Sequence, residues 1–156
     1  MCIRDRLTAC DAALLIGDAA LTARTQGCHV YDLAELWRKH TGKAFVFAVW
    51  AVRRDALEQM KPGLDLPGIF SRSRDHGLED ASVQQLAQQW SHRLGLTEPD
   101  IANYLRQNIH YHLDAECMEG LHLFFEYAKK FGLIPKVPKL EFLGSKSRAP
   151  VPAHHR

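Results

Sequence analysis

The sequence predicts an α/β fold that becomes helix-rich after residue 55. Two continuous apolar runs, at 12–17 and 45–53, have the pattern of strands covered on both faces, as in a parallel sheet flanked by helices. After residue 55 the apolar residues recur at helical spacing instead. Because two strands are too few to cover several amphipathic helices, we expect partner strands elsewhere in a longer protein.

The early part of the chain contains signals for two helices. A short helix over 19–25 follows the first predicted strand, and Asp18 is the expected N-cap. Asp32 is expected to cap a second helix over 33–40, whose apolar residues share one face. Gly42 is expected to end this helix, and the second predicted strand follows.

Helices dominate the remainder of the chain. Thr97 and Asp114 are expected N-caps, because each has an oxygen side chain just before a helical apolar pattern. Gly132 is expected to end the last helix, and an extended arm should follow over 133–143. The predicted helices in this part start near residue 55 and then cover 69–75, 78–94, 98–106 and 115–131.

Composition excludes several classes of protein. A net charge of +2 over 156 residues is too weak to indicate binding to nucleic acid or to an acidic membrane surface. No apolar run approaches the roughly 20 residues of a membrane span, and no signal peptide is visible. The four cysteines have no CxxC spacing and the nine histidines are scattered, so we expect neither a disulfide framework nor a metal site. These features favour a cytoplasmic protein.

The candidate ligand-binding residues lie at the end of the first predicted strand and within the second. In open α/β sheets, ligands bind just beyond the carboxyl ends of strands, which points to Gly17, Asp18 and Ala19. Asp18 has an alternative role as a helix cap, and Phe47 and Trp50 have an alternative place in the core. No Ser-His-Asp order, phosphate-binding loop or dinucleotide fingerprint is present.

Three motifs of the chain form a specific combination. They are Ile16-Gly17-Asp18-Ala19-Ala20-Leu21, Asp32-Leu33 followed by Trp37, and the run Thr41-Gly42-Lys43-Ala44-Phe45-Val46-Phe47-Ala48-Val49-Trp50-Ala51. Together they resemble the C-terminal half of the chorismate dehydratases of the futalosine route to menaquinone. The resemblance covers about residues 9–143. It departs from the family pattern at Ala44, where proline is usual, and this should loosen the turn.

The resemblance implies a fold and a domain division. The fold would be the C-terminal part of a two-lobed type II periplasmic-binding-protein-like architecture. Residues 7–44 would end the second lobe, and residues 45–143 would form a crossover strand and a helical return to the first lobe. Residues 1–6 are expected to be a non-native leader and residues 144–156 a disordered tail.

The resemblance also implies a reaction. The whole enzyme would be a hydro-lyase that converts chorismate to 3-[(1-carboxyvinyl)oxy]benzoate and water, without a metal or redox cofactor. Gly17, Asp18, Ala19, Phe47 and Trp50 would contact the substrate. The catalytic residues would lie in an N-terminal half that this chain lacks, so the chain alone should be inactive and should expose apolar surface. The alternative is a non-catalytic solute-binding protein of the same fold, and the oligomeric state stays open.

Overall fold

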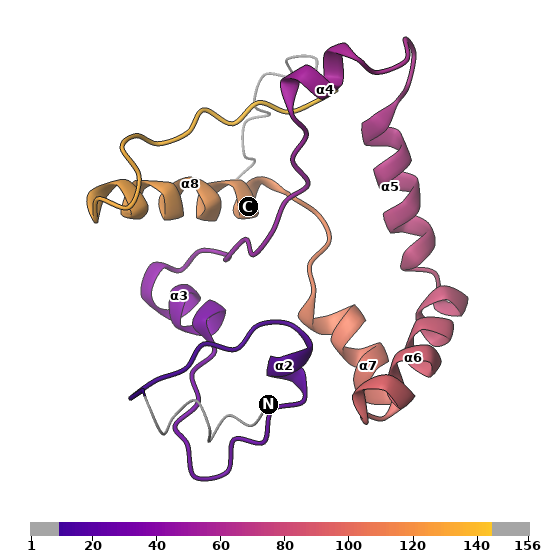
Figure 1. Ribbon diagram of the computed structural model, residues 1–156, viewed down its shortest axis with the longest axis vertical. Coiled ribbons are helices and arrows are strands. Elements are labelled where there is room, and N and C mark those ends of the chain that lie inside the picture. Colours follow the sequence, from indigo (N-terminus) through magenta and orange to yellow (C-terminus); the bar gives the residue numbers. More distant parts are fainter. Residues whose placement is uncertain (1–9, 145–156) are drawn as a thin grey trace, which may run out of the picture.

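The computed structural model describes residues 10–144, and in that range every regular element is a helix. Figure 1 shows an open arrangement, with α5, α6 and α7 along one side and α3 and α8 on the other. The expected leader at 1–6 and all but the first residue of the expected tail lie outside the described residues. The helices are α2 (Asp18–Leu21), α3 (Leu33–Thr41), α4 (Arg54–Glu58), α5 (Leu66–Gly77), α6 (Asp80–Leu94), α7 (Glu98–Asn103), η1 (Tyr104–Asn108) and α8 (Ala115–Lys130).

The two predicted strands, at 12–17 and 45–53, do not form within the described part of the chain. Both apolar runs are irregular there, although neither becomes a helix. A strand needs a partner to complete its hydrogen-bond ladder, and no second strand lies beside either run in residues 10–144. Their side chains are correspondingly open to solvent, because Phe47 is 75% and Trp50 is 85% exposed. The prediction of two buried strands is therefore wrong for the structure of this chain.

The helix boundaries follow the capping signals closely. The Asp32 carboxylate accepts hydrogen bonds from the backbone N–H groups of Ala34 and Glu35 at 2.8 and 3.0 Å, which confirms it as the N-cap of α3. Asp114 accepts from the backbone N–H of Cys117 at 2.9 Å in the same way and begins α8. The helices expected over 33–40 and 115–131 are thus confirmed.

Helix α7 begins at the expected cap and ends in an unexpected form. The Thr97 hydroxyl accepts a hydrogen bond from the backbone N–H of Asp100 at 3.2 Å. The chain then widens into the single π-helical turn η1 instead of continuing as an α-helix to about residue 106. Such widened turns are rare and occur frequently at functional sites, which draws attention to Tyr104.

The buried residues of the described part of the chain form two small groups. Val83 and Ala87 of α6 pack with Ile101 of α7, and all three are almost fully buried. The second group is the inner face of α8, which includes Gly120 and Leu121. No helix within residues 10–144 is both long and apolar enough to cross a membrane.

An aromatic cluster joins α3 to α8. The Trp37 ring lies edge-on to Phe45, Phe124 and Tyr127, with ring centroids 5.8 to 5.9 Å apart. Figure 1 shows the chain after α8 turning back along that helix toward α4, and Arg54 of α4 donates a hydrogen bond to Glu141 at 2.6 Å. The expected arm at 133–143 therefore reaches the region where the irregular segment 44–53 ends.

Candidate functional site

The Gly17–Ala19 turn has a backbone conformation that glycine makes possible. Gly17 has a φ of 65°, and its carbonyl oxygen accepts the N–H groups of Ala20 and Leu21 at 2.8 and 3.2 Å. It is Gly17 that occupies the N-cap position, so the expectation that Asp18 would cap the helix is wrong. Asp18 is instead the first helical residue, and its side chain is left for other contacts.

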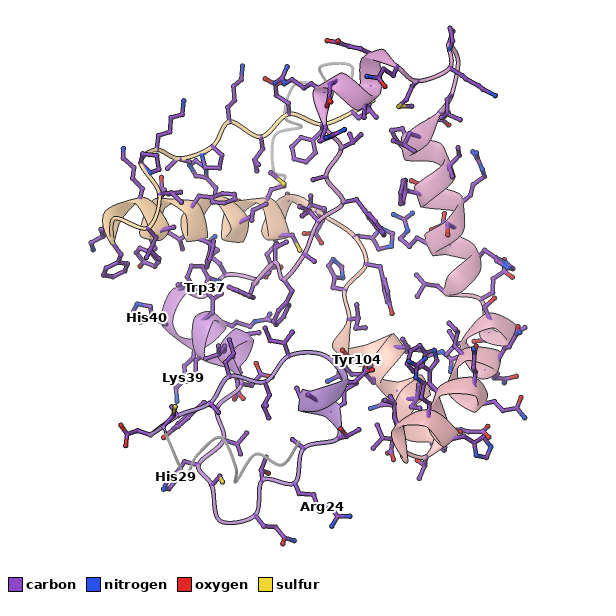
Figure 2. The ribbon with its side chains drawn as sticks, in the orientation of Figure 1. Arg24, His29, Trp37, Lys39, His40 and Tyr104 are labelled. Carbon is purple, nitrogen blue, oxygen red and sulfur yellow. The ribbon has the colours of Figure 1, made fainter. Side chains whose placement is uncertain are left out.

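Asp18 lies at the edge of a cavity of about 340 Å³ between α2 and the α6–α7–η1 unit. Leu86, Trp90 and Ile101 contribute to a largely apolar wall. The polar groups in the lining include the carboxylates of Asp18 and Asp100 and the phenol of Tyr104, which is labelled in Figure 2. The cavity can therefore hold an apolar body beside hydrogen-bond acceptors.

The carboxylates of Asp18 and Asp100 differ in how firmly they are held. The Thr97 hydroxyl donates a hydrogen bond to the Asp100 carboxylate at 2.6 Å, while its oxygen caps α7. Asp100 is therefore held in place by the start of its own helix. Asp18 is exposed, and it is the acid that is better able to turn toward a ligand.

The predicted aromatic site residues lie elsewhere. Phe47 packs edge-on against Phe45 with ring centroids 4.9 Å apart, and Trp50 packs against Phe70 of α5 at 4.8 Å. Neither aromatic residue lines the cavity beside Asp18. The structure therefore does not bring the five predicted site residues together.

The start of segment 44–53 is firmly attached, which positions the two aromatic residues that follow. The Trp37 indole N–H donates a hydrogen bond to the carbonyl oxygen of Ala44 at 3.2 Å. Lys43 forms an ion pair with Glu119 of α8. The hydrogen bond connects the segment to α3, where Trp37 is labelled in Figure 2, and the ion pair connects it to α8.

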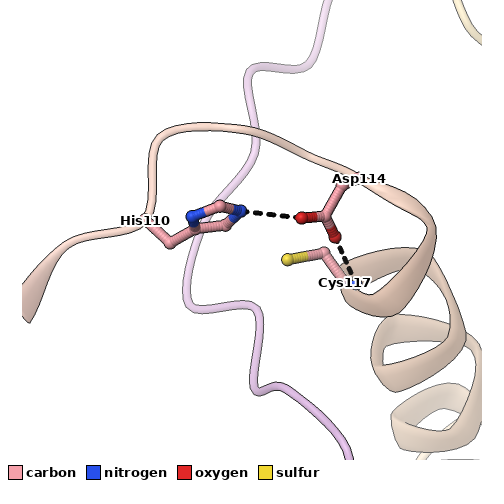
Figure 3. A group of neighbouring side chains, drawn as sticks. All are labelled: His110, Asp114 and Cys117. Atoms are coloured by element: carbon pink, nitrogen blue, oxygen red, sulfur yellow. Dashed lines mark hydrogen bonds and ion pairs between the residues drawn. The ribbon is translucent and has the colours of Figure 1, made fainter.

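A polar cluster that the sequence analysis did not predict lies at the start of α8. Figure 3 shows His110, Asp114 and Cys117 converging there. One nitrogen, one oxygen and one sulfur from these residues lie within 4.8 Å of one another. His110 Nε2 is 2.9 Å from Asp114 Oδ2. The only sequence signal was an N-cap aspartate with histidine four residues before it and cysteine three after it.

The environment of this cluster shifts two pKa values in opposite directions. The hydrogen bond from the Cys117 backbone N–H, assisted by His110, lowers the pKa of Asp114. Burial, assisted by the nearby Asp114, raises the pKa of the Cys117 thiol. Asp114 is therefore an anion at neutral pH, whereas the thiol keeps its proton and is a poor nucleophile there.

Comparisons with known proteins connect the chain to menaquinone synthesis. The family model described as menaquinone biosynthesis matches residues 2–130. The chain is 33% identical over 137 residues to a curated chorismate dehydratase of Thermus thermophilus, an alignment covering 77% of this chain and 48% of that protein. The chain thus spans about half the length of this relative. No solved structure matches the chain.

Proposed function

This chain belongs to the menaquinone biosynthesis family, and from that premise we propose that the whole protein dehydrates chorismate to 3-[(1-carboxyvinyl)oxy]benzoate. The observation that supports this most is the 33% identity to a chorismate dehydratase over 137 residues. The reaction is that of a hydro-lyase. A base removes a proton from a ring carbon, the hydroxyl group leaves as water, and formation of the aromatic ring provides much of the driving force.

The substrate carries two carboxylates, and this limits where it can bind. Among the described residues, the lining of the cavity beside Asp18 includes a second carboxylate, that of Asp100, and no cationic side chain. Two fixed negative charges repel a dianion, so the carboxylates of chorismate should bind outside this cavity. We assign Asp18 the role of accepting a hydrogen bond from the ring hydroxyl, which approaches without a charge.

Gly17 and Ala19 would contact the same end of the substrate through their backbone. A Cβ atom built on Gly17 would meet nothing within 4 Å, so there is open space beside this turn. A ligand can approach a glycine backbone closely because no side chain intervenes.

Phe47 and Trp50 are proposed to contact one face of the substrate ring. Their exposure leaves much of each ring surface uncovered in this chain, and such aromatic faces can pack against the face of a substrate ring and of its aromatic product. In this proposal they approach the substrate from a different side than Asp18. The groups that bind the carboxylates and transfer the proton would come from the part of the whole protein beyond this chain.

The finer description of the fold belongs to the same proposal. We propose that the whole protein is a two-lobed α/β protein of the periplasmic-binding-protein-like type, with residues 7–44 in one lobe and residues 45–143 returning to the other. Family membership supports the two-lobed architecture in this proposal.

Turnover by the full-length protein tests the activity. Incubation with chorismate should give an aromatic product lighter by one water, detected by mass spectrometry. Replacing both Phe47 and Trp50 by alanine should raise the KM roughly tenfold, because the substrate loses its contacts with two aromatic rings. The control is Phe131→Ala, because Phe131 is similarly exposed at 72% but lies at the far end of α8. Chorismate binding without any dehydrated product would instead support a solute-binding protein.

A further inference from the structure

The strongest unassigned feature is the cluster of three different metal-binding side chains at the start of α8. His110 comes from the link that follows η1, and Asp114 and Cys117 come from the first turn of α8. Nothing in the proposed dehydration uses these residues, and none of them lines the cavity beside Asp18.

We propose that His110, Asp114 and Cys117 bind a single Zn²⁺ ion, with a water molecule as the fourth ligand. Zinc accepts nitrogen, oxygen and sulfur ligands at about 2.0 to 2.3 Å in a tetrahedron, which separates the ligand atoms by roughly 3.3 to 3.7 Å. The three atoms already lie within 4.8 Å of one another. Small side-chain rotations are therefore enough to complete the tetrahedron.

The backbone of α8 holds the central ligand in a suitable position. Asp114 uses Oδ1 to cap the helix at the N–H of Cys117, and Oδ2 faces His110 at 2.9 Å. One carboxylate oxygen thus fixes the side chain while the other is directed at the cluster. Such a preorganised ligand lowers the entropic cost of binding a metal.

The charges and ligand types favour zinc over the common hard cations. Cys117 would release its thiol proton when the metal binds, and the resulting thiolate and the Asp114 carboxylate would together neutralise a dication. The exposed Glu116 adds negative charge nearby. Ca²⁺ and Mg²⁺ prefer sites made of oxygen ligands alone, whereas imidazole and thiolate suit zinc. The ion would join the 109–114 link to α8. It would thereby fix the orientation of α7 and η1, which precede this link, relative to α8.

The test is metal binding by the full-length protein after a chelator has stripped it, with Co²⁺ as the spectroscopic probe and Zn²⁺ as the competitor. One Co²⁺ per chain should produce a thiolate-to-cobalt absorption band, and Zn²⁺ should abolish it. Cys117→Ser should remove the band, and His110→Gln and Asp114→Asn should each weaken binding at least tenfold. The matched controls are Cys28→Ser and His112→Gln, which should change neither property.

The variants separate a ligand role from a structural one. Asparagine caps a helix about as well as aspartate. Asp114→Asn should therefore keep the helical circular dichroism of the protein while it loses affinity for the metal. If that variant unfolds, His110→Gln decides, because no backbone hydrogen bond of α8 depends on His110. Absence of Co²⁺ binding, or a thiolate band that survives Cys117→Ser, would overturn the proposal. None of these outcomes depends on chorismate turnover.

Discussion

Gly120 lies so close to Ala44 that a Cβ atom on the glycine would be 2.0 Å from the alanine carbonyl oxygen. That oxygen also accepts the hydrogen bond from Trp37. The backbone of residue 44 is therefore held between α3 and α8, and the buried helical glycine is what allows α8 to approach it. Residue 44 is thus a junction of three segments.

Gly120→Ala should destabilise the protein. Alanine gains about 1 kcal/mol of helix propensity over glycine, but a contact this short with backbone forces α8 away from residue 44. Overpacking of this kind costs about 1 to 3 kcal/mol, so we expect a net decrease in the free energy of unfolding measured with urea. Gly77→Ala is the control, because Gly77 ends α5 and an added Cβ would have nothing within 4 Å. This substitution should leave the free energy of unfolding unchanged or increase it.

Trp37→Phe should separate the hydrogen bond from the aromatic packing. The variant keeps a ring against Phe45 and Phe124 but removes the donor to Ala44. We expect a loss of about 1 kcal/mol in the free energy of unfolding, the usual net value of one hydrogen bond. Trp50→Phe at an 85% exposed position should change stability by less than about 0.5 kcal/mol. Equal effects of the two substitutions would contradict the role given to the indole N–H.

Sequence reasoning located the helices because their signals are local. The caps at Asp32, Thr97 and Asp114 are satisfied within three residues of each side chain. The end of the last helix is equally local, since the N–H of Gly132 bonds to the carbonyl of Lys129 and that of Leu133 to Ala128. Such contacts do not depend on the rest of the fold.

The features that sequence reasoning missed depend on residues far apart in the chain or on the path of a link. The apolar runs at 12–17 and 45–53 have strand composition, but a strand forms only when another strand pairs with it. The contact between Ala44 and Gly120 joins positions 76 residues apart, and the periodicity of apolar residues does not reveal such a contact. His110 reaches Asp114 only because the link after η1 turns back toward α8, and the π-helical turn itself was unexpected.

Asp32→Ala should destabilise the start of α3 and lower the free energy of unfolding. The substitution removes the acceptor for two backbone N–H groups at the start of the helix, at a cost of about 0.5 to 2 kcal/mol. Asp32→Asn keeps the acceptor oxygen and should stay close to the wild-type free energy of unfolding. If both variants lose the same stability, the charge of Asp32 matters and the cap does not.

The ion pair between Lys43 and Glu119 should make stability depend on pH in the alkaline range. The hydrogen bond to Glu119, followed by the charge of that carboxylate, raises the pKa of Lys43 above the ordinary 10.5. The folded state therefore holds the proton more tightly than the unfolded state does. The contribution of the pair is complete below pH 10.5 and decreases as the pH rises through the higher folded-state pKa.

Denaturant unfolding of wild type and Lys43→Gln at neutral pH and above pH 10.5 measures this contribution. The difference in stability between the two proteins should be small at neutral pH, because both partners are exposed, and it should shrink further as the pH rises. Tyr111, whose pKa is raised by burial, titrates in both proteins and cancels from the difference. Lys139→Gln, at an exposed position on the C-terminal arm, is the control for loss of a lysine charge outside this ion pair. A difference for Lys43→Gln that grows with pH would show that Glu119 does not stabilise the charged form of Lys43.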